Sequence, residues 1–263
     1  MVLTMKLFLK IAFLGTKYCG YQVQNNASTI QQALNEAAER VFGFECDVVG
    51  CSRTDSGVHA NEFCLTVSQK GVQHLNHSIP IDKIPTAFNS LLPDDIAVFY
   101  AEMVSDEFHP RYDVKYKEYV YKIWNGKYKN PFAGDRMYNC PFHISKASIN
   151  EMNVAAKAFI GKHDFTSFMA TGSKITDAVR TVYYADVFAD GDIVIFKVAA
   201  DGFLYNMVRI MVGTLLDVAR NKFSYEAIGG IINSKCRKNA GSTASACGLY
   251  LNKVSYEEYT VND

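Results

Sequence analysis

The stretch at residues 50–60, GCSRTDSGVHA, gathers an arginine, a carboxylate and a glycine into one short loop. On local sequence alone a turn is the better interpretation of Asp55, since Asp, Ser and Gly are typical turn residues. A turn does not require Arg53, however, and loops that contain glycine commonly present functional side chains. An ionised carboxylate held in a pocket can act as a nucleophile or as a general base. Asp55 is therefore a candidate catalytic residue if a second group keeps it charged.

Such a group is available in residues 203–219, FLYNMVRIMVGTLLDVA, which are apolar nearly all round and predict a buried helix. Arg209 lies in the middle of this stretch. Its guanidinium could reach the surface along its aliphatic stem. If it stays inside, it requires an acid, because an unpaired buried charge costs several kcal/mol. Asp55 is the natural partner, and an adjacent arginine would favour its charged form.

Helical and strand-like patterns supply the elements that must position these residues. Ser28 and Gln31 form a capping box ahead of an apolar helical stripe, and Gly43 ends that helix. A second capping box at Ser148 opens a helix that Gly161 ends. Strand-like runs occupy residues 6–13, 46–50, 63–67, 96–104, 116–124, 181–188 and 193–200.

Strands joined by hairpins, with helices between them, predict the α+β class with a largely antiparallel sheet. Asp190 and Gly191 mark the clearest hairpin turn. We expect two similar halves that share a central sheet flanked by helices. The first half, residues 1–107, carries the Asp55 loop, and the second, residues 108–263, carries Arg209.

Composition limits the classes of protein that remain. Hydrophobic residues make up 49% of the 263 residues, so a packed core is expected and disorder is not. The formal net charge is zero, with 27 basic and 27 acidic residues. This balance argues weakly against a nucleic-acid partner, which usually requires a basic excess, although a local basic surface remains compatible with it.

Cysteine usage and the N-terminal pattern indicate a cytoplasmic protein. The seven cysteines include no CxxC pair, which favours reduced thiols over disulfides or a zinc site. Along residues 6–13 the large apolar side chains recur at every second position, as they do in a strand, and the segment does not resemble a signal peptide. No stretch has the length that a membrane span requires.

The loop GCSRTDSGVHA resembles the G-x-x-R-T-D-x-G-V-H-A loop of the TruA family of pseudouridine synthases, which modify transfer RNA. Further blocks resemble the family in the same order: FLGTKYCGYQVQ, FHPRYDVKYKEYVYKI, KHDFTSF, GFLYNMVRIMVGTLL and AGSTASACGLYL. Any one block alone would be weak, whereas the ordered set is specific. Leu14, Ser56 and Ser245 depart from the residues that the family often has, and none of them removes a group that the chemistry requires.

The resemblance implies a pseudouridine synthase-like fold and the isomerisation of uridine to pseudouridine. Asp55 matches the catalytic aspartate, which either attacks the ribose anomeric carbon or removes a ribose proton to give a glycal. Tyr119 matches the tyrosine that packs on the target base and assists proton transfer at C5. Arg209 matches the arginine that pairs with the aspartate, and Arg53 matches the loop arginine that helps to extrude the nucleotide. His59 is expected to have a structural role.

The same resemblance implies the partners. We expect a homodimer that binds one tRNA across both subunits, with target uridines around positions 38–40 of the anticodon stem-loop. The reaction is redox-neutral, so no cofactor and no metal is expected, and the sequence contains neither a dinucleotide fingerprint nor metal-ligand spacing.

The expected RNA-binding side chains lie in two basic clusters, although such clusters are as often only solvated surface. The residues assigned to RNA are Arg111, Lys115, Lys117, Arg237 and Lys238.

Three alternatives remain at this stage. The chain could be an RNA-binding protein that keeps the fold without the activity, or a paralogous synthase with a different RNA target. An unrelated hydrolase that uses Asp55 with a histidine is a weaker alternative, since no histidine lies in a recognisable nucleophile motif.

Overall fold

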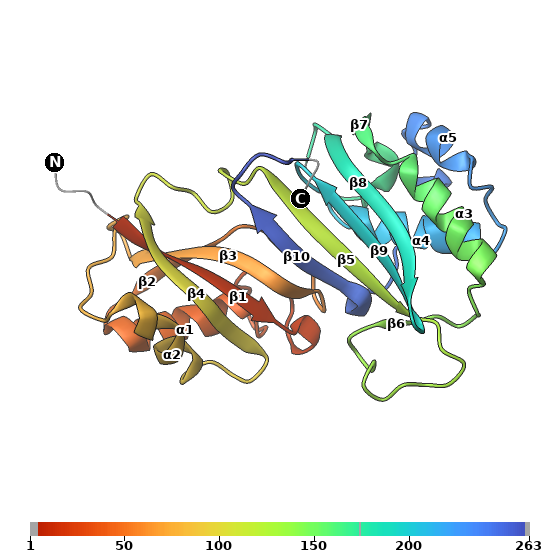
Figure 1. Ribbon diagram of the computed structural model, residues 1–263. Coiled ribbons are helices and arrows are strands. Elements are labelled where there is room, and N and C mark those ends of the chain that lie inside the picture. Colours follow the sequence, from red (N-terminus) through yellow and green to blue (C-terminus); the bar gives the residue numbers. More distant parts are fainter. Residues whose placement is uncertain (1–4, 174, 261–263) are drawn as a thin grey trace. The chain divides into compact units, whose positions relative to one another are not determined.

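The computed structural model describes residues 5–173 and 175–260, which fold into two compact units (Figure 1). Unit 1 consists of Met1–Val114 with Leu251–Tyr256, and unit 2 consists of Lys115–Tyr250 with Glu257–Asp263.

Unit 1 is built on antiparallel strands, in which β4 pairs with β1, β1 with β3, and β3 with β2. The strands are β1 (Met5–Phe13), β2 (Cys46–Gly50), β3 (His59–Gln69) and β4 (Ile96–Ser105), and the helices are α1 (Ile30–Phe42) and α2 (Ile84–Asn89). Leu7, Leu9 and Ile11 alternate along β1 and are fully buried, so the alternation that predicted a strand also supplies its core face. α1 packs against β2, α2 packs against β4, and Figure 1 shows both helices on the same side of these strands.

Unit 1 also includes most of β10 (Leu249–Ser255), which neighbours β3 in the strand order. The backbone N–H of Val254 donates to Oε1 of Glu62 at 3.1 Å. The ring of Tyr256 packs edge-to-face on that of Phe8, with the ring centroids 5.8 Å apart. The chain therefore returns to unit 1 after it has built most of unit 2.

Unit 2 has its own largely antiparallel strands, in the order β5-β9-β8-β7, and β6 pairs in parallel with β5. The strands are β5 (Tyr116–Trp124), β6 (Tyr138–Asn139), β7 (Gly161–Asp164), β8 (Val179–Asp190) and β9 (Ile193–Ala200), and the helices are α3 (Lys146–Lys157), α4 (Met207–Ala219) and α5 (Ala227–Asn233). α3 packs on β8, and α4 packs on α3. Eleven residues of α4 are buried, which makes it the central helix of this unit.

Within the described residues, five short 3₁₀ helices connect these elements, at Gly15–Lys17, Ile81–Lys83, Thr166–Phe168, Arg237–Asn239 and Ala246–Gly248. The sheet in this part of the chain is mixed and mostly antiparallel and is flanked by five α-helices, so the α+β class predicted from the sequence is confirmed. The predicted strands at 46–50, 116–124 and 193–200 match the observed strands residue for residue, and the hairpin between β8 and β9 turns at Gly191 with a φ of 56°.

The predicted helix starts are wrong in both amphipathic helices. The N-cap of α1 is Thr29 and not Ser28, because Oγ1 of Thr29 accepts a hydrogen bond from the backbone N–H of Gln32 at 3.3 Å. The side chain of Gln31 takes no part in a capping box, since its Oε1 accepts a hydrogen bond from the backbone N–H of Val23 at 3.0 Å. The end of α1 at Gly43 is confirmed by its left-handed backbone.

α3 is capped by Ser145 and not by Ser148, whose backbone N–H donates to the Ser145 hydroxyl at 3.1 Å. It ends at Lys157, before Gly161, which is the first residue of β7. α4 likewise begins at Met207 and not at 203, because Asn206 has a φ of 59° and cannot continue a right-handed helix. Within the described residues, no helix has the length and apolar character needed to cross a membrane.

Candidate active site

The Asp55 loop (residues 51–58) connects β2 to β3 and contains a tight turn. The backbone N–H of Val58 donates to the Asp55 carbonyl at 3.2 Å, and Gly57 has a φ of 78°, which favours glycine. The turn predicted from Asp-Ser-Gly is therefore present. It leaves Asp55 half-buried and Arg53 exposed.

A second stretch of unit 1, the support segment (residues 15–21), holds this loop through its backbone. The backbone N–H of Tyr21 donates to the Thr54 carbonyl at 3.2 Å. The hydroxyl of Ser56, a departure from the family motif, donates to the Tyr18 carbonyl at 3.2 Å. At Gly15 the approach is so close that an added Cβ would lie 1.9 Å from the Val58 carbonyl oxygen. Only glycine therefore allows the two backbones to meet here.

His59, the first residue of β3, bonds to the support segment directly after the Asp55 loop. It is fully buried, and its Nδ1 accepts a hydrogen bond from the backbone N–H of Gly15 at 3.0 Å. Because Nδ1 is the acceptor, a neutral ring carries its proton on Nε2. This contact supports the structural role that the sequence predicts for His59.

Two tyrosines of the support segment are buried beneath the loop. The ring of Tyr21 stacks on Phe63 with centroids 4.4 Å apart, and burial, with a smaller contribution from Cys51, raises its pKa well above the usual value. The hydroxyl of Tyr18 donates to Oδ1 of Asp95 at 2.5 Å, and burial together with this bond raises the pKa of Tyr18. Both phenols therefore stay protonated at neutral pH.

Arg209 is half-buried in the first turn of α4. Its Nε donates to the Ala244 carbonyl at 2.7 Å, and its Nη1 donates to Oδ1 of Asn206 at 2.8 Å. The backbone N–H of Ala244 in turn donates to the Arg209 carbonyl at 3.0 Å. These bonds fix the direction in which the guanidinium points.

Ala244 belongs to a loop at residues 240–244 that lies directly on α4. A Cβ added to Gly213 would lie 1.7 Å from the Ser242 carbonyl oxygen, so helix and loop touch backbone to backbone. Oγ1 of Thr214 accepts from the backbone N–H of Gly241 at 2.9 Å and donates to the Ile210 carbonyl at 2.8 Å. The 240–244 loop is therefore held in register along the helix.

Tyr119 lies in β5, opposite Val198 of β9. Its side chain is 8% exposed, and its ring meets Phe203 edge-to-face with centroids 5.0 Å apart. Tyr116 and Tyr121 are buried in the core. The chain thus carries the Asp55 loop in unit 1 and both Tyr119 and Arg209 in unit 2.

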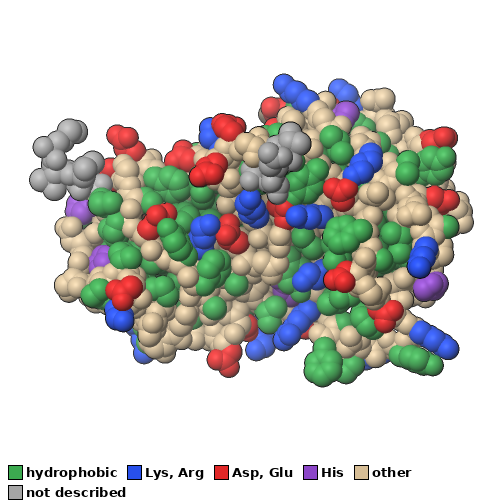
Figure 2. All heavy atoms as spheres, in the orientation of Figure 1, with side chains coloured by type: hydrophobic (Ala, Val, Ile, Leu, Met, Phe, Trp, Pro, Cys, Tyr) green, Lys and Arg blue, Asp and Glu red, His purple; other side chains and the backbone are tan. Residues whose placement is uncertain are grey.

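The basic residues predicted to bind RNA differ in their exposure and in whether their side chains already bond to other groups of the protein. Arg111 and Lys238 are exposed, Lys117 is half-buried, and Lys115 forms an ion pair with Glu258 at 2.8 Å. Arg237 is half-buried and donates to the 240–244 loop, and burial lowers its pKa. Their assignment to RNA stays a prediction. Over the face in Figure 2, acidic and basic side chains are interspersed, in keeping with the zero net charge.

Sequence reasoning missed the groups that hold the candidate residues. Asn206 and Ala244 accept hydrogen bonds from Arg209, and Thr214 holds the 240–244 loop. Gly15 and Tyr18 support the Asp55 loop. An asparagine just before an apolar helix is a signal for a left-handed residue and could have placed the start of α4. The remaining contacts join residues far apart in the sequence, and no local pattern marks them.

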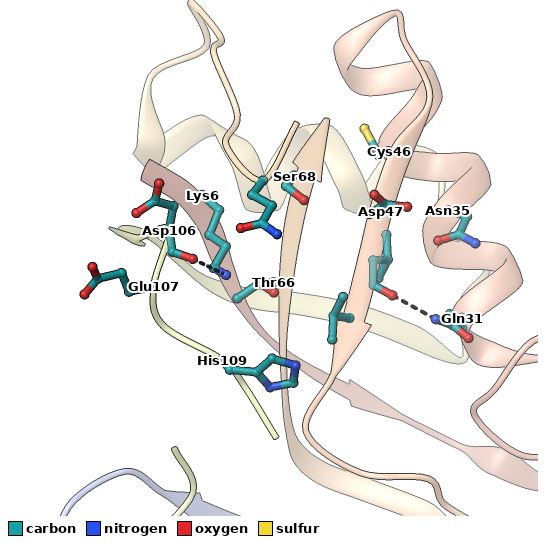
Figure 3. A pocket seen from close by; sticks show the side chains of 13 residues that line it. Lys6, Gln31, Asn35, Cys46, Asp47, Thr66, Ser68, Asp106, Glu107 and His109 are labelled. Carbon is teal, nitrogen blue, oxygen red and sulfur yellow. Dashed lines mark hydrogen bonds between the residues drawn. The ribbon is translucent and has the colours of Figure 1, made fainter. Parts of the chain in front are cut away.

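A polar hollow of about 620 Å³ lies elsewhere in unit 1, between α1, the strands β1 to β3 and residues 106–109 (Figure 3). Two of its lining side chains are tied to backbone carbonyls. Lys6 Nζ donates to the Asp106 carbonyl and Gln31 Nε2 donates to the Val48 carbonyl, each at 2.8 Å. Asp55 is not among the lining residues, so this hollow is separate from the predicted site. Among the residues that the structure describes, no three His, Cys, Asp or Glu side chains are grouped so as to hold a metal ion.

Comparison with known proteins identifies the family. Residues 10–113 and 155–257 match the family model described as tRNA pseudouridine synthase. The chain therefore belongs to the tRNA pseudouridine synthase family.

Individual relatives match along nearly their whole length. The chain is 45% identical over 243 residues to tRNA pseudouridine synthase A of Thermoanaerobacter sp. (strain X514), covering 92% of this chain and 96% of that protein. It is 43% identical over 248 residues to the protein of the same name from Clostridium acetobutylicum, covering 94% and 98%. With the Bacillus licheniformis protein of that name it shares 42% identity over 260 residues, covering 96% and 100%.

Proposed function

We propose that this protein is a tRNA pseudouridine synthase, an isomerase that converts uridine in tRNA to pseudouridine. The observation that carries this proposal is the family match through both units, together with an Asp55 loop whose backbone the support segment holds. The reaction breaks the bond between N1 of the base and C1′ of the ribose, joins C1′ to C5, and in net terms removes one proton from C5 and adds one to N1.

The chemical roles proposed for the chain's own residues follow from their side chains. Asp55 either attacks the anomeric carbon or removes a ribose proton, and Arg209 keeps this carboxylate ionised by favouring its charged form. Tyr119 packs on the extruded base and assists the loss of the C5 proton. Arg53, exposed on the same loop as Asp55, assists extrusion of the nucleotide, which costs a few kcal/mol of lost stacking and pairing.

The finer features are proposed from the family resemblance. The target uridines lie around positions 38–40 of the anticodon stem-loop, and the enzyme acts in the cytoplasm as a homodimer. The residues proposed to contact RNA phosphates are Arg111, Lys115 and Lys117, with Lys238 in the second cluster.

The test is Asp55→Asn, which keeps the size of the side chain and removes its capacity as a nucleophile or base. We expect turnover of tRNA to fall to background while tRNA affinity and fold persist. The measurement is pseudouridine mapping in tRNA after incubation with each variant. Asp94→Asn is the matched control, because Asp94 is an exposed carboxylate of the same unit.

Multiple turnover by Asp55→Asn would exclude the assigned chemistry. If the wild-type protein binds tRNA without forming pseudouridine, it is an RNA-binding protein of the same fold. If it modifies another RNA instead, it is a paralogous synthase.

A further inference from the structure

The position of the Arg209 guanidinium depends on a loop that is distant in sequence. Its Nε bond ends on the Ala244 carbonyl, so any shift of the 240–244 loop along α4 moves this acceptor. The loop meets the helix without side chains between them at Gly213, which leaves no soft layer to absorb a displacement.

Arg237 is a second side chain that holds this loop. Its Nη1 donates to the Gly241 carbonyl at 2.9 Å and to the Ala240 carbonyl at 3.4 Å. Its Nη2 donates to Oγ1 of Thr243 at 3.2 Å. One planar guanidinium therefore holds the 240–244 loop at three residues, Ala240, Gly241 and Thr243.

Arg237 itself is attached to a buried part of unit 2. The backbone N–H of its neighbour Cys236 donates to Oγ of Ser167 at 2.8 Å, and Ser167 is fully buried. The Ser167 hydroxyl donates to the Ile231 carbonyl in α5 at 2.7 Å. The guanidinium thus connects a fixed point of the core to the loop.

We infer that Arg237 is a positioning residue for Arg209 and acts through the 240–244 loop. Its place in a basic cluster predicts phosphate binding instead. This inference rests on the proposed function of Arg209. Two nitrogens of the half-buried Arg237 guanidinium donate to three acceptors of its own unit, and these bonds aim that face of the guanidinium at the loop and not at solvent, where a phosphate would bind.

The decisive variant is Arg237→Lys, because it separates charge from geometry. Lysine keeps the positive charge that a phosphate contact needs, but one ammonium cannot reproduce the planar fork. We expect the single-turnover rate at saturating enzyme to fall about 10- to 100-fold, since small misplacements of a catalytic group have effects of this size. The dissociation constant for tRNA and the slope of its logarithm against log salt should stay at the wild-type values.

Arg220→Lys is the matched control, since Arg220 is an exposed arginine of the same unit whose guanidinium lies over the Phe142 ring. It should keep the wild-type rate. Arg237→Gln serves as the second variant: a phosphate contact would flatten its salt slope by about 0.7 to 0.9. A flattened slope with an unchanged saturating rate, or a wild-type rate for Arg237→Lys, would overturn the inference.

A double-mutant cycle separates positioning of Arg209 from a general loss of stability. If Arg237 acts through Arg209, then Arg237→Lys should cause no further loss of rate in an Arg209→Lys background. A full additional loss in that background would show that Arg237 acts independently of Arg209, and the inference would be wrong.

Amide hydrogen exchange at Ala244 and Gly241 tests, without any RNA, whether Arg237 holds the 240–244 loop. Exchange at both amides should be faster in Arg237→Lys than in Arg220→Lys. Unchanged exchange overturns the inference even if the wild type is active. If the wild type forms no pseudouridine, the proposed function fails. Faster exchange in Arg237→Lys would still support the role of Arg237 in holding the 240–244 loop.

Discussion

Asp55 and Arg209 are held in different ways, although each depends on a second segment of its own unit. In unit 1 the support segment bonds to the backbone carbonyl of Thr54 in the Asp55 loop and to the side chain of His59 at the start of β3. In unit 2 the support reaches the side chain itself, because Ala244 and Asn206 accept from the guanidinium. The aspartate side chain is short, so a fixed backbone at Asp55 largely fixes the position of its carboxylate. The arginine side chain is long and keeps much rotamer freedom until its guanidinium is also held.

Both supports nevertheless include the same kind of contact. Each brings two backbones into contact at a glycine, Gly15 against Val58 and Gly213 against Ser242. The variants below test whether the two contacts are equivalent and how far each support extends.

The largest effect is expected from Gly15→Ala and Gly213→Ala. An added methyl would overlap a backbone carbonyl in each case, and no side chain can move aside. We expect each change to lower the free energy of unfolding by about 3 kcal/mol and to inactivate the protein. Urea denaturation measures the first effect and the tRNA assay the second.

Gly229→Ala in α5 is the control, since a Cβ there meets nothing within 4 Å. It should be neutral or stabilising by up to about 1 kcal/mol. Wild-type stability for either Gly15→Ala or Gly213→Ala would show that only one of the two supports depends on backbone contact.

The next effect is expected at His59. Replacement by Leu leaves the buried N–H of Gly15 without its acceptor, which should cost about 2 kcal/mol of unfolding free energy. His59→Asn places an oxygen close to the former Nδ1 and should recover part of that loss. Equal losses in thermal or urea denaturation would contradict the hydrogen-bonding role of the ring.

A smaller effect is expected at Asn206, where backbone and side-chain roles can be separated. Asn206→Gly keeps access to the left-handed backbone and removes only the acceptor for Nη1, so stability should fall by less than about 1 kcal/mol. Asn206→Ala should lose about 1 kcal/mol more, because alanine disfavours that backbone. If the glycine variant keeps the wild-type single-turnover rate, the Asn206 acceptor has no part in holding Arg209.

The smallest effect concerns an ion pair of unit 2, in which Lys235 lies 2.8 Å from Asp164. The hydrogen bond from Lys235, followed by that from Thr166, lowers the pKa of the Asp164 carboxyl to about 2. A carboxyl with a lowered pKa stabilises the fold above its unfolded pKa of about 4, and this contribution is lost as pH falls through about 2.

Asp164→Asn should therefore lower the melting temperature slightly at pH 7, since exposed ion pairs contribute little. The difference from wild type should shrink between about pH 4 and pH 2. A difference that stays constant over this range would show that the charge of Asp164 does not contribute.

The sequence predicted most of the strands because their signal is local. Alternating apolar residues define β1, and a two-residue turn signal defines the hairpin of β8 and β9. Helix starts were predicted less well, because Ser28 and Thr29 are both good caps and only the observed bond from Gln32 decides between them. Asn206 shows the same limit, since its left-handed backbone shortens α4 by one turn.

The candidate residues were visible in the sequence because Asp55 lies in a contiguous motif and Arg209 interrupts an apolar helix. Their supports were not visible. Gly15 and Val58, or Gly213 and Ser242, are brought together only by the folded chain, and any one of these residues alone has an ordinary local explanation. Arg237 illustrates the consequence, since its place in a run of basic residues predicted RNA contact while its bonds lead to the 240–244 loop.

The return of β10 to unit 1 also sets an order of assembly during translation. A ribosome releases Met5 to Val114 long before it releases Leu251 to Tyr256, with the body of unit 2 made in between. At ordinary elongation rates the delay is on the order of ten seconds. Throughout that time the carboxylate of Glu62 lacks its Val254 amide and the ring of Phe8 lacks Tyr256. The unit that is synthesised first is therefore completed only after most of unit 2 has been made, and a nascent chain stalled within unit 2 presents an unfinished edge to chaperones and proteases.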